Sequence, residues 1–217
     1  GLSASTEGET LFKNIDLNLA KGDKVVVFSR DSRATTAFYE IVSGNLKQED
    51  GKFQWGVTTS QSYLPLDNHS FFEKKMSLVD WLRQWAKTEE EREEVFIRGF
   101  LGKMLFSGEE PLKAVSNCSG GEKMRLMFSK LMLENPNVLL LDDPTNHLDL
   151  ESIQSVNESL EKYEGALFFS SHDYSFIESI ATKVINLTPK GAVVFDGTFE
   201  EYMSDDKIKA RVEEMYK

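Results

Sequence analysis

Three short apolar runs constrain the fold more than any other feature of the sequence. They are residues 24–28 (KVVVF), 137–141 (NVLLL) and 166–170 (ALFFS). Continuous apolar runs of this length are typical of strands that are buried on both faces of a parallel sheet. Segments with helical periodicity separate these runs, so we expect an α/β fold with a mostly parallel sheet covered by helices.

Composition excludes several classes of protein. The net charge of −11 opposes a broad nucleic-acid-binding face, which would need clustered Lys and Arg. The single cysteine, Cys118, excludes an internal disulfide and is typical of a reducing compartment. No apolar run approaches the roughly 20 residues of a membrane span. We therefore expect a cytoplasmic protein without a membrane span, and the abrupt first residues indicate a piece of a longer chain.

The periodicity divides the chain into three parts. Residues 1–69 are expected to form the first part of the core with antiparallel strands, and further strands are predicted over 11–19 and 53–63. Residues 70–133 are predicted to form an inserted helical subdomain, and 134–217 the remainder of the core with a C-terminal helix. Two tryptophans in the helical part are four residues apart, which favours a place in its core over contact with a ligand.

Polar residues follow each of the three apolar runs, at 29–36, 142–143 and 171–172. Parallel sheets bind ligands at the carboxyl ends of their strands. An acid at such an end can hold Mg²⁺, and a second carboxylate can orient or deprotonate a water. A single strand-end Asp is as well explained as a helix N-cap, but three such sites together favour a ligand site.

A helix is expected to start at Ser119. Ser119 and Glu122 have the spacing of a capping box, and Gly120 and Gly121 lie between them. A helix N-terminus with free N–H groups and a serine hydroxyl is suited to bind a phosphate.

These segments resemble the motifs of ABC-class ATPases. Residues 119–122 (SGGE), 139–149 (LLLDDPTNHLD) and 170–173 (SSHD) are similar to the signature, the Walker B and D-loop segment, and the switch histidine of that family. Glu122 and NHLD at 146–149 resemble the ABC-F group, which comprises soluble proteins with two tandem ATPase domains, many of them acting on the ribosome. The segments TTSQSY and LFSGEE are similar to the second of the two domains.

The resemblance implies a P-loop NTPase fold, ATP and Mg²⁺ as cofactors, and the ribosome as an expected partner of the full-length protein. It gives catalytic roles to Asp143 and His172, and Mg²⁺ binding to Thr36 and Asp142. The residues that it places around nucleotides are Ser29, Arg30, Asp31, Ser32, Arg33, Ala34, Thr35, Thr36, Ser119, Gly120, Gly121, Glu122 and Asp149.

The phosphate loop departs from the family pattern G-x-x-G-x-G-K-[ST]. All three glycines are replaced, and Thr35 stands at the place of the lysine. One lost charged hydrogen bond costs roughly 1.5–3 kcal/mol, or about one to two decades of affinity. Two interpretations of Arg30 and Arg33 stay open: they compensate in part for the lysine, or they are only solvated.

Two further departures concern catalysis. Asp143 replaces the family's glutamate and withdraws the carboxylate by about 1.5 Å, and a misplacement of that size can cost on the order of 100-fold in rate. The position of the Q-loop glutamine falls on Leu66, or on Gln61 if the register is shifted.

The signature is preserved while the phosphate loop is degenerate. In this family two domains pair head to tail, so that each ATP lies between one domain's phosphate loop and the other's signature. We therefore expect a domain that donates its signature to a partner domain's ATP, within a tandem protein that hydrolyses ATP, and that has weak or no activity alone. Two alternatives are an ATPase subunit of an ABC transporter and a non-catalytic structural module.

Overall fold

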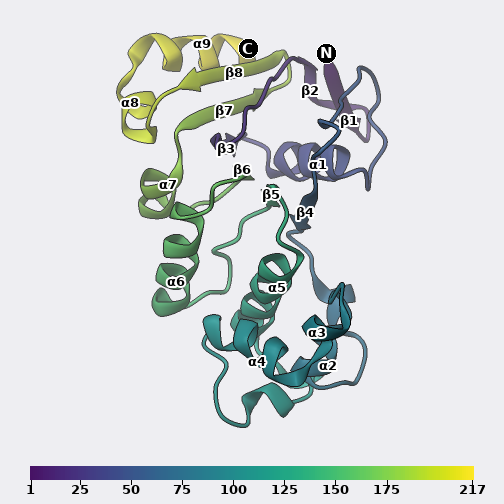
Figure 1. The fold of residues 1–217 in the computed structure, drawn as a ribbon. Helices are drawn as coiled ribbons and strands as arrows, with labels where there is room; N and C mark the ends of the chain where they lie inside the picture. The colour runs from purple at the N-terminus through teal and green to yellow at the C-terminus, as the bar shows by residue number, and fades with distance from the viewer. The chain divides into compact units, whose positions relative to one another are not determined.

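The computed structural model of the chain describes residues 1–217, and these form two compact units. Unit 1 comprises Gly1–Leu66, Asn137–Pro144 and Tyr163–Lys217, and unit 2 comprises Asp67–Pro136 and Thr145–Lys162. Figure 1 labels the elements of both units. None of the helices combines the length and the apolar character needed to cross a membrane.

A six-stranded sheet is the centre of unit 1. Its strand order is β4-β5-β6-β3-β7-β8, in which the first five strands are parallel and β8 runs antiparallel to β7. The sheet confirms the expected α/β fold, because the three apolar runs form three adjacent parallel strands, β3, β5 and β6. The strands are β3 (Lys24–Phe28), β4 (Gln61–Leu64), β5 (Val138–Leu141), β6 (Ala166–Phe169), β7 (Lys183–Thr188) and β8 (Gly191–Asp196).

A second, two-stranded sheet pairs β1 (Leu2–Thr6) with β2 (Glu9–Ile15) in antiparallel fashion. The strand predicted over 53–63 is wrong for most of its length, since only β4 forms there. Trp55 explains part of the difference. Its indole N–H donates to the carbonyl of Val42 at 2.9 Å, so this segment is tied to a helix and not to a neighbouring strand.

Helix α1 (Ser32–Ser43) contributes several buried side chains to the core of unit 1. Asp31 caps its start, and Gly44 ends it with φ 86°, a left-handed conformation that glycine adopts without strain. Phe38, which is 2% exposed, makes edge-to-face contacts with Phe12 and Phe168 at ring distances of 6.4 and 5.6 Å. One side chain therefore joins α1 to both sheets.

Three more helices belong to unit 1. Helix α9 contacts β7 and β8, and α8 contacts α7 and α9. Their bounds are α7 (Tyr174–Ile180), α8 (Phe199–Ser204) and α9 (Asp206–Tyr216).

The named elements of unit 2 are all helices. Trp81 is 1% exposed and stacks on Phe72 at 5.2 Å, and its indole N–H donates to the Phe71 carbonyl, which confirms that it is a core residue. The α-helices are α2 (Leu78–Arg83), α3 (Glu89–Arg92), α4 (Glu94–Lys103), α5 (Gly120–Glu134) and α6 (Leu150–Glu161), and the 3₁₀ turns are His69–Phe72, Glu110–Leu112 and Val115–Asn117.

We expect Phe38→Ala to lower the free energy of unfolding by about 3–5 kcal/mol, because it leaves a cavity where three aromatic side chains meet. Urea denaturation measures the change. Phe53→Ala is the control: Phe53 is 37% exposed, and its loss should cost about 1 kcal/mol or less. Equal losses in the two variants would contradict this account of the core.

Candidate functional site

The carboxyl ends of β3, β5 and β6 lie side by side, because these strands are neighbours in the sheet. Their polar residues meet at Asp142, which follows β5 and is 2% exposed. Thr36 Oγ1 donates to Asp142 Oδ2 at 2.7 Å, and Ser170 Oγ donates to Asp142 Oδ1 at 2.9 Å. The structure therefore brings Thr36 and Asp142, both predicted from the sequence, into direct contact.

Burial raises the pKa of the Asp142 carboxyl. The hydroxyls of Thr36 and Ser170 act in the opposite direction, and the charges of Asp143 and Glu40 add to the rise. A nearby cation would offset both burial and these negative charges. The electrostatics at this point favour a bound cation.

Asp143 has an uncommon backbone conformation for a residue with a side chain, with φ 51°. Its N–H donates to Ser170 Oγ at 3.0 Å, while the hydroxyl of Ser170 donates to Asp142. A single serine thus links the two acids that follow β5. The side chain of His172, which was predicted to be catalytic, is exposed just after β6.

Thr36 and Asp142 are suited in chemistry to Mg²⁺, since both offer hard oxygen ligands. No group of three or more His, Cys, Asp or Glu side chains forms a metal cluster there. Mg²⁺ is commonly held by one or two protein oxygens together with substrate phosphates and water. The two residues would therefore hold this ion only in company with phosphate.

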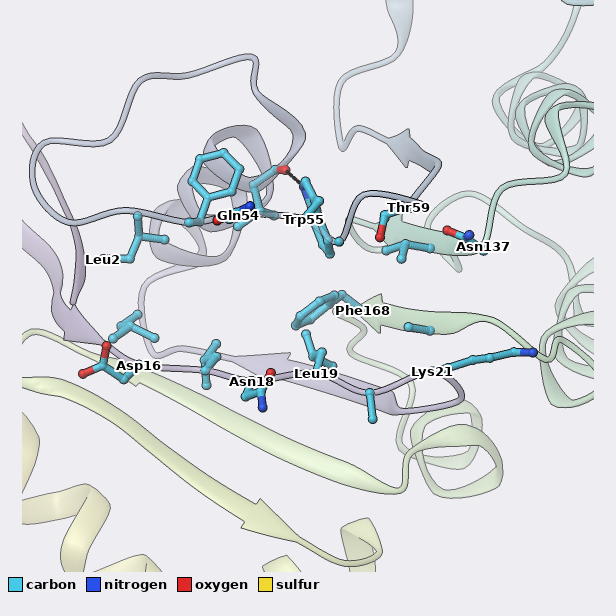
Figure 2. A pocket seen from close by; sticks show the side chains of 18 of the residues that line it. Leu2, Asp16, Asn18, Leu19, Lys21, Gln54, Trp55, Thr59, Asn137 and Phe168 are labelled. Atoms are coloured by element: carbon cyan, nitrogen blue, oxygen red, sulfur yellow. Dashed lines mark hydrogen bonds between the residues drawn. The ribbon is translucent and has the colours of Figure 1, made fainter.

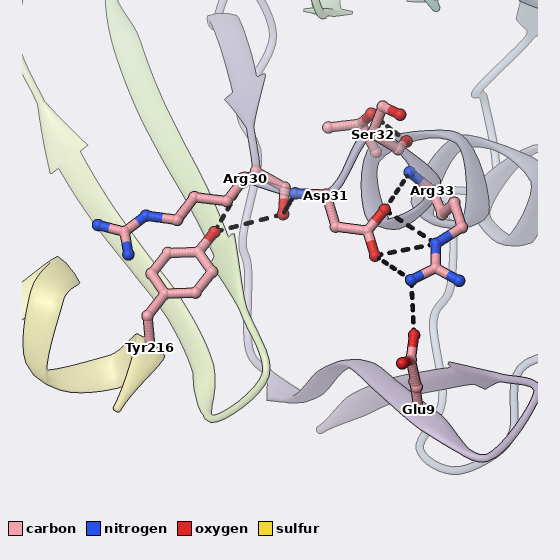
Figure 3. Close-up of polar contacts among 8 residues, drawn as sticks. Glu9, Arg30, Asp31, Ser32, Arg33 and Tyr216 are labelled. Carbon is pink, nitrogen blue, oxygen red and sulfur yellow. Dashed lines mark hydrogen bonds and ion pairs between the residues drawn. The ribbon is translucent and has the colours of Figure 1, made fainter.

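The start of α1 is occupied by a carboxylate of the chain itself (Figure 3). Asp31 Oδ1 accepts the backbone N–H of Arg33 at 2.9 Å, and the Arg33 guanidinium binds both carboxylate oxygens of Asp31 at 2.7–3.0 Å. The same guanidinium reaches Glu9 Oε2 at 2.7 Å. The hydrogen bonds from Arg33 hold the pKa of Asp31 below its usual range. The N-terminal end of α1, where an anion is favoured, already has one.

Arg30 is held by helix α9. Its backbone N–H donates to the hydroxyl of Tyr216 at 2.9 Å, its guanidinium carbon lies 4.3 Å from the centre of the Tyr216 ring, and the guanidinium pairs with Glu213. The two arginines are more than solvated, and whether they compensate in part for the lysine stays a prediction. Both are half-exposed, and both are paired with carboxylates of the chain.

The other loop residues do not form a phosphate cradle. The hydroxyl of Thr35 donates to the Ser32 carbonyl at 2.8 Å, and Ala34 is fully buried. None of residues 29–36 has positive φ. Cradles of consecutive N–H groups commonly alternate right- and left-handed residues, which glycine permits. The loop therefore lacks the backbone shape that wraps phosphates.

The two candidates for the Q-loop position, Gln61 and Leu66, lie at opposite ends of β4. Gln61 is the first residue of β4, and its amide donates to the Ser43 carbonyl at 3.3 Å, whereas Leu66 follows the strand and is 44% exposed. Gln61 lies at the amino end of the strand, so it does not reach the polar groups at the carboxyl ends.

The predicted capping box is present in unit 2. Ser119 Oγ accepts the N–H of Glu122 at 3.2 Å, and Glu122 Oε2 accepts the N–H of Ser119 at 2.7 Å. Burial would raise the pKa of Glu122, but Lys113, with its Nζ 2.8 Å away, and the Ser119 N–H bring it below its usual value. Because Ser119 Oγ acts here as an acceptor, its hydroxyl proton stays available to another group.

Gly120 and Gly121 lie against the turn that holds His147. A Cβ on Gly121 would come within 2.9 Å of the His147 carbonyl oxygen, so the close approach requires glycine there. Their N–H groups belong to the first turn of α5, where no intrahelical partner is available. A cavity of about 350 Å³ opens beside them, lined by Ser119, Gly120, Gly121, Glu122, Arg125, His147 and Asp149.

Asp149 is the N-cap of α6, and its Oδ1 accepts the N–H of Ser152 at 2.8 Å. Hydrogen bonds from Ser152, and the charge of Arg125, lower the pKa of Asp149. All five predicted residues of unit 2 therefore line one cavity, together with Arg125 and His147.

A larger groove, of about 790 Å³, lies elsewhere in unit 1 (Figure 2). Phe38, Trp55 and Phe168 form apolar walls, and Lys21 and Asn137 lie near its rim. Lys21 precedes β3 and Asn137 precedes β5, so the groove is at the amino ends of the strands. It contains none of the predicted site residues.

Sequence reasoning missed Ser170, Tyr216, Glu213 and Glu9. Ser170 could have been found, because it ends the third apolar run and immediately precedes the predicted Ser171 and His172. The partners of the arginines carry no local pattern, since Glu213 is 183 residues from Arg30 in the sequence.

We expect Ser170→Ala to lower the free energy of unfolding by about 1–3 kcal/mol, because it leaves the Asp143 N–H and one Asp142 oxygen without this partner. Chemical denaturation measures the loss. The exposed Ser159 on α6 is the matched control, and Ser159→Ala should change stability by about 0.5 kcal/mol or less. If both variants were equally stable, Ser170 would not link the two acids as described.

Comparisons with known proteins show the family to which the chain belongs. The chain is 43% identical over 217 residues to the ABC transporter ATP-binding protein YkpA of Bacillus subtilis, covering 100% of this chain and 40% of YkpA. It is 36% identical over 209 residues to the probable ATP-binding protein YbiT of Escherichia coli O157:H7, covering 96% of this chain and 39% of YbiT. The chain thus spans about two fifths of the length of these relatives.

A solved structure shows the same fold. The ATP-binding cassette MJ0796, in a dimeric post-hydrolysis state bound to ADP and Pi, superposes with a TM-score of 0.71 at 15% identity, over 90% of this chain and 95% of that one. The family model described as ABC transporter matches residues 12–146, which is more than half of the sequence. The chain is therefore an ATPase domain of the ABC transporter family.

Proposed function

We propose that this chain donates its signature to ATP held by a second ATPase domain, while its own phosphate loop binds nucleotide weakly or not at all. The observation that carries the proposal is the contrast between two helix starts. The first turn of α5 has free N–H groups beside a cavity, whereas the first turn of α1 is bound to Asp31. Only the α5 start is ready for an external anion.

The donor role rests on three groups. The N–H groups of Gly120 and Gly121 and the hydroxyl of Ser119 face a phosphate that approaches along the axis of α5, a helix of 15 residues. Lys113 neutralises Glu122, so the carboxylate of the capping box repels an incoming phosphate less than a free carboxylate would. Asp149 and His147 would border the same nucleotide from the next loop. ATP supplies the phosphate, and these groups orient it and stabilise its charge.

The weakness of the chain's own site follows from its loop. The lysine is absent, the glycines are absent, and both arginines are paired internally. Thr36 and Asp142 could still hold Mg²⁺ beside phosphate, with Asp143 and His172 next to it, but Asp143 is shorter than the family's glutamate. Hydrolysis is therefore assigned to the partner's ATP, and the full protein is the active ATPase.

The partner domain is proposed to belong to the same protein, as in the tandem ABC-F group. The matched relatives are more than twice as long as this chain, which leaves room for a second domain of this size. The solved MJ0796 cassette is a dimer, which supports pairing as the working arrangement. A cytoplasmic location and a ribosome partner of the full-length protein belong to the same proposal and rest on the resemblance to ABC-F proteins.

The test is Ser119→Arg in the full-length protein. The longer, positively charged side chain fills the cavity beside α5, so we expect ATPase activity to fall by about 10- to 100-fold, the equivalent of losing charged hydrogen bonds to phosphate. Ser159→Arg, which places the same charge on an exposed position of α6, should leave the activity unchanged.

Unchanged activity in Ser119→Arg would remove the donor role and favour a purely structural module. If Ser159→Arg lost as much activity as Ser119→Arg, the effect would come from added charge and not from the signature.

A further inference from the structure

The last turn of α9 reaches the first residues of the phosphate loop through Tyr216 (Figure 3). The Tyr216 hydroxyl accepts the N–H of Arg30 at 2.9 Å, lies 3.3 Å from Ser29 Oγ, and donates to the carbonyl of Leu187 at 2.7 Å. Leu187 belongs to β7, so the tyrosine joins the loop to the sheet. Glu213, one turn earlier on α9, forms an ion pair with the guanidinium of Arg30.

These contacts use the groups that a phosphate would need. A phosphate at this loop would be bound by backbone N–H groups and by a cation, and Arg30, like Arg33, offers one of each. The phenol oxygen of Tyr216 satisfies the N–H, and the carboxylate of Glu213 takes the place of a phosphate oxygen on the guanidinium. A phosphate and the turn of α9 cannot both hold Arg30 in these ways.

Helix α9 is held to the rest of unit 1 by few apolar contacts. Val212 is its only buried side chain, and the helix is otherwise rich in charged residues. Arg30 and Glu213 are each more than half exposed, and ion pairs of that kind contribute little stability. The contact is therefore formed by groups that can part without disrupting the core. Arg33 differs, because its partners Asp31 and Glu9 lie in α1's own cap and in β2.

We propose that the last turn of α9 is an internal occupant of the phosphate loop, and that it competes with the phosphates of a nucleotide for Arg30. The inference deepens the proposed weakness of the chain's own site and rests on that part of the proposed function. It assigns to Glu213 and Tyr216 the role of keeping this loop closed to phosphate.

The experiment measures nucleotide affinity in the 217-residue chain with Glu213→Gln and Tyr216→Phe, singly and combined. Tyr216→Phe keeps the ring on Arg30 but removes the hydroxyl, and Glu213→Gln removes the negative charge. We expect the combined variant to bind a fluorescent ATP analogue about tenfold more tightly than the unaltered chain, since one charged contact becomes available. Glu214→Gln is the matched control, because Glu214 is exposed at the next position without an ion pair to Arg30.

Inorganic tripolyphosphate is titrated in parallel. Equal tightening for tripolyphosphate and for the ATP analogue supports competition for phosphate, whereas tightening for the ATP analogue alone would overturn it. Hydrogen exchange at the Arg30 amide verifies that the contact is lost, with faster exchange expected in Tyr216→Phe. Faster exchange with unchanged or weaker binding would show that α9 only packs against the loop, and the proposal would fail.

The affinity measurements on the α9 variants can be distinguished from the test of the donor role. That role is measured as ATPase activity of Ser119→Arg in the full-length protein, which does not involve Arg30. A loss of activity there, with no gain of affinity here, would leave the pairing of domains standing and remove only the internal occupant.

Discussion

The start of a helix favours a single anion, and in this chain Asp31 takes that place at α1. Its carboxylate accepts the N–H of Arg33 and binds the guanidinium of the same residue, so this end of α1 already holds an anion. The other features of the loop are consistent with this bond. No residue from 29 to 36 has a left-handed conformation, so the loop does not require glycine. Arg30 pairs with Glu213. This arrangement is the basis for the proposal that the loop binds phosphate weakly.

The start of α5 shows the opposite arrangement with nearly the same local chemistry. It too has a side-chain cap, but the cap is a serine, and the reciprocal glutamate is neutralised by Lys113. Two glycines follow, and the turn at His147 lies too close to them for any other residue at Gly121. The result is a helix start that is stable alone and still presents N–H groups to a cavity. The two helix starts thus differ in what lies beside them: a carboxylate of the chain at α1, and a cavity at α5.

Much of this could be predicted from local patterns. The three apolar runs and the capping box at Ser119 each depend on residues a few positions apart, and both predictions were confirmed. The strand predicted over 53–63 was mostly wrong, because Trp55 bonds to α1, a contact that alternation of apolar residues cannot reveal. The partners of Arg30 could not be predicted either, because they too are long-range contacts. They come from α9, and only the folded sheet brings β7 and that helix to the loop.

The central claim is that the two phosphate-binding surfaces of this domain are unequal, and it is tested most directly by counting nucleotides. A non-hydrolysable ATP analogue with Mg²⁺ is titrated by calorimetry into the full-length protein in which this domain pairs with its partner. The account predicts one tightly bound analogue per pair, and its loss in Ser119→Arg. Two analogues bound with equal affinity per pair would contradict it, since the loop of residues 29–36 would then bind phosphate as well as an intact one.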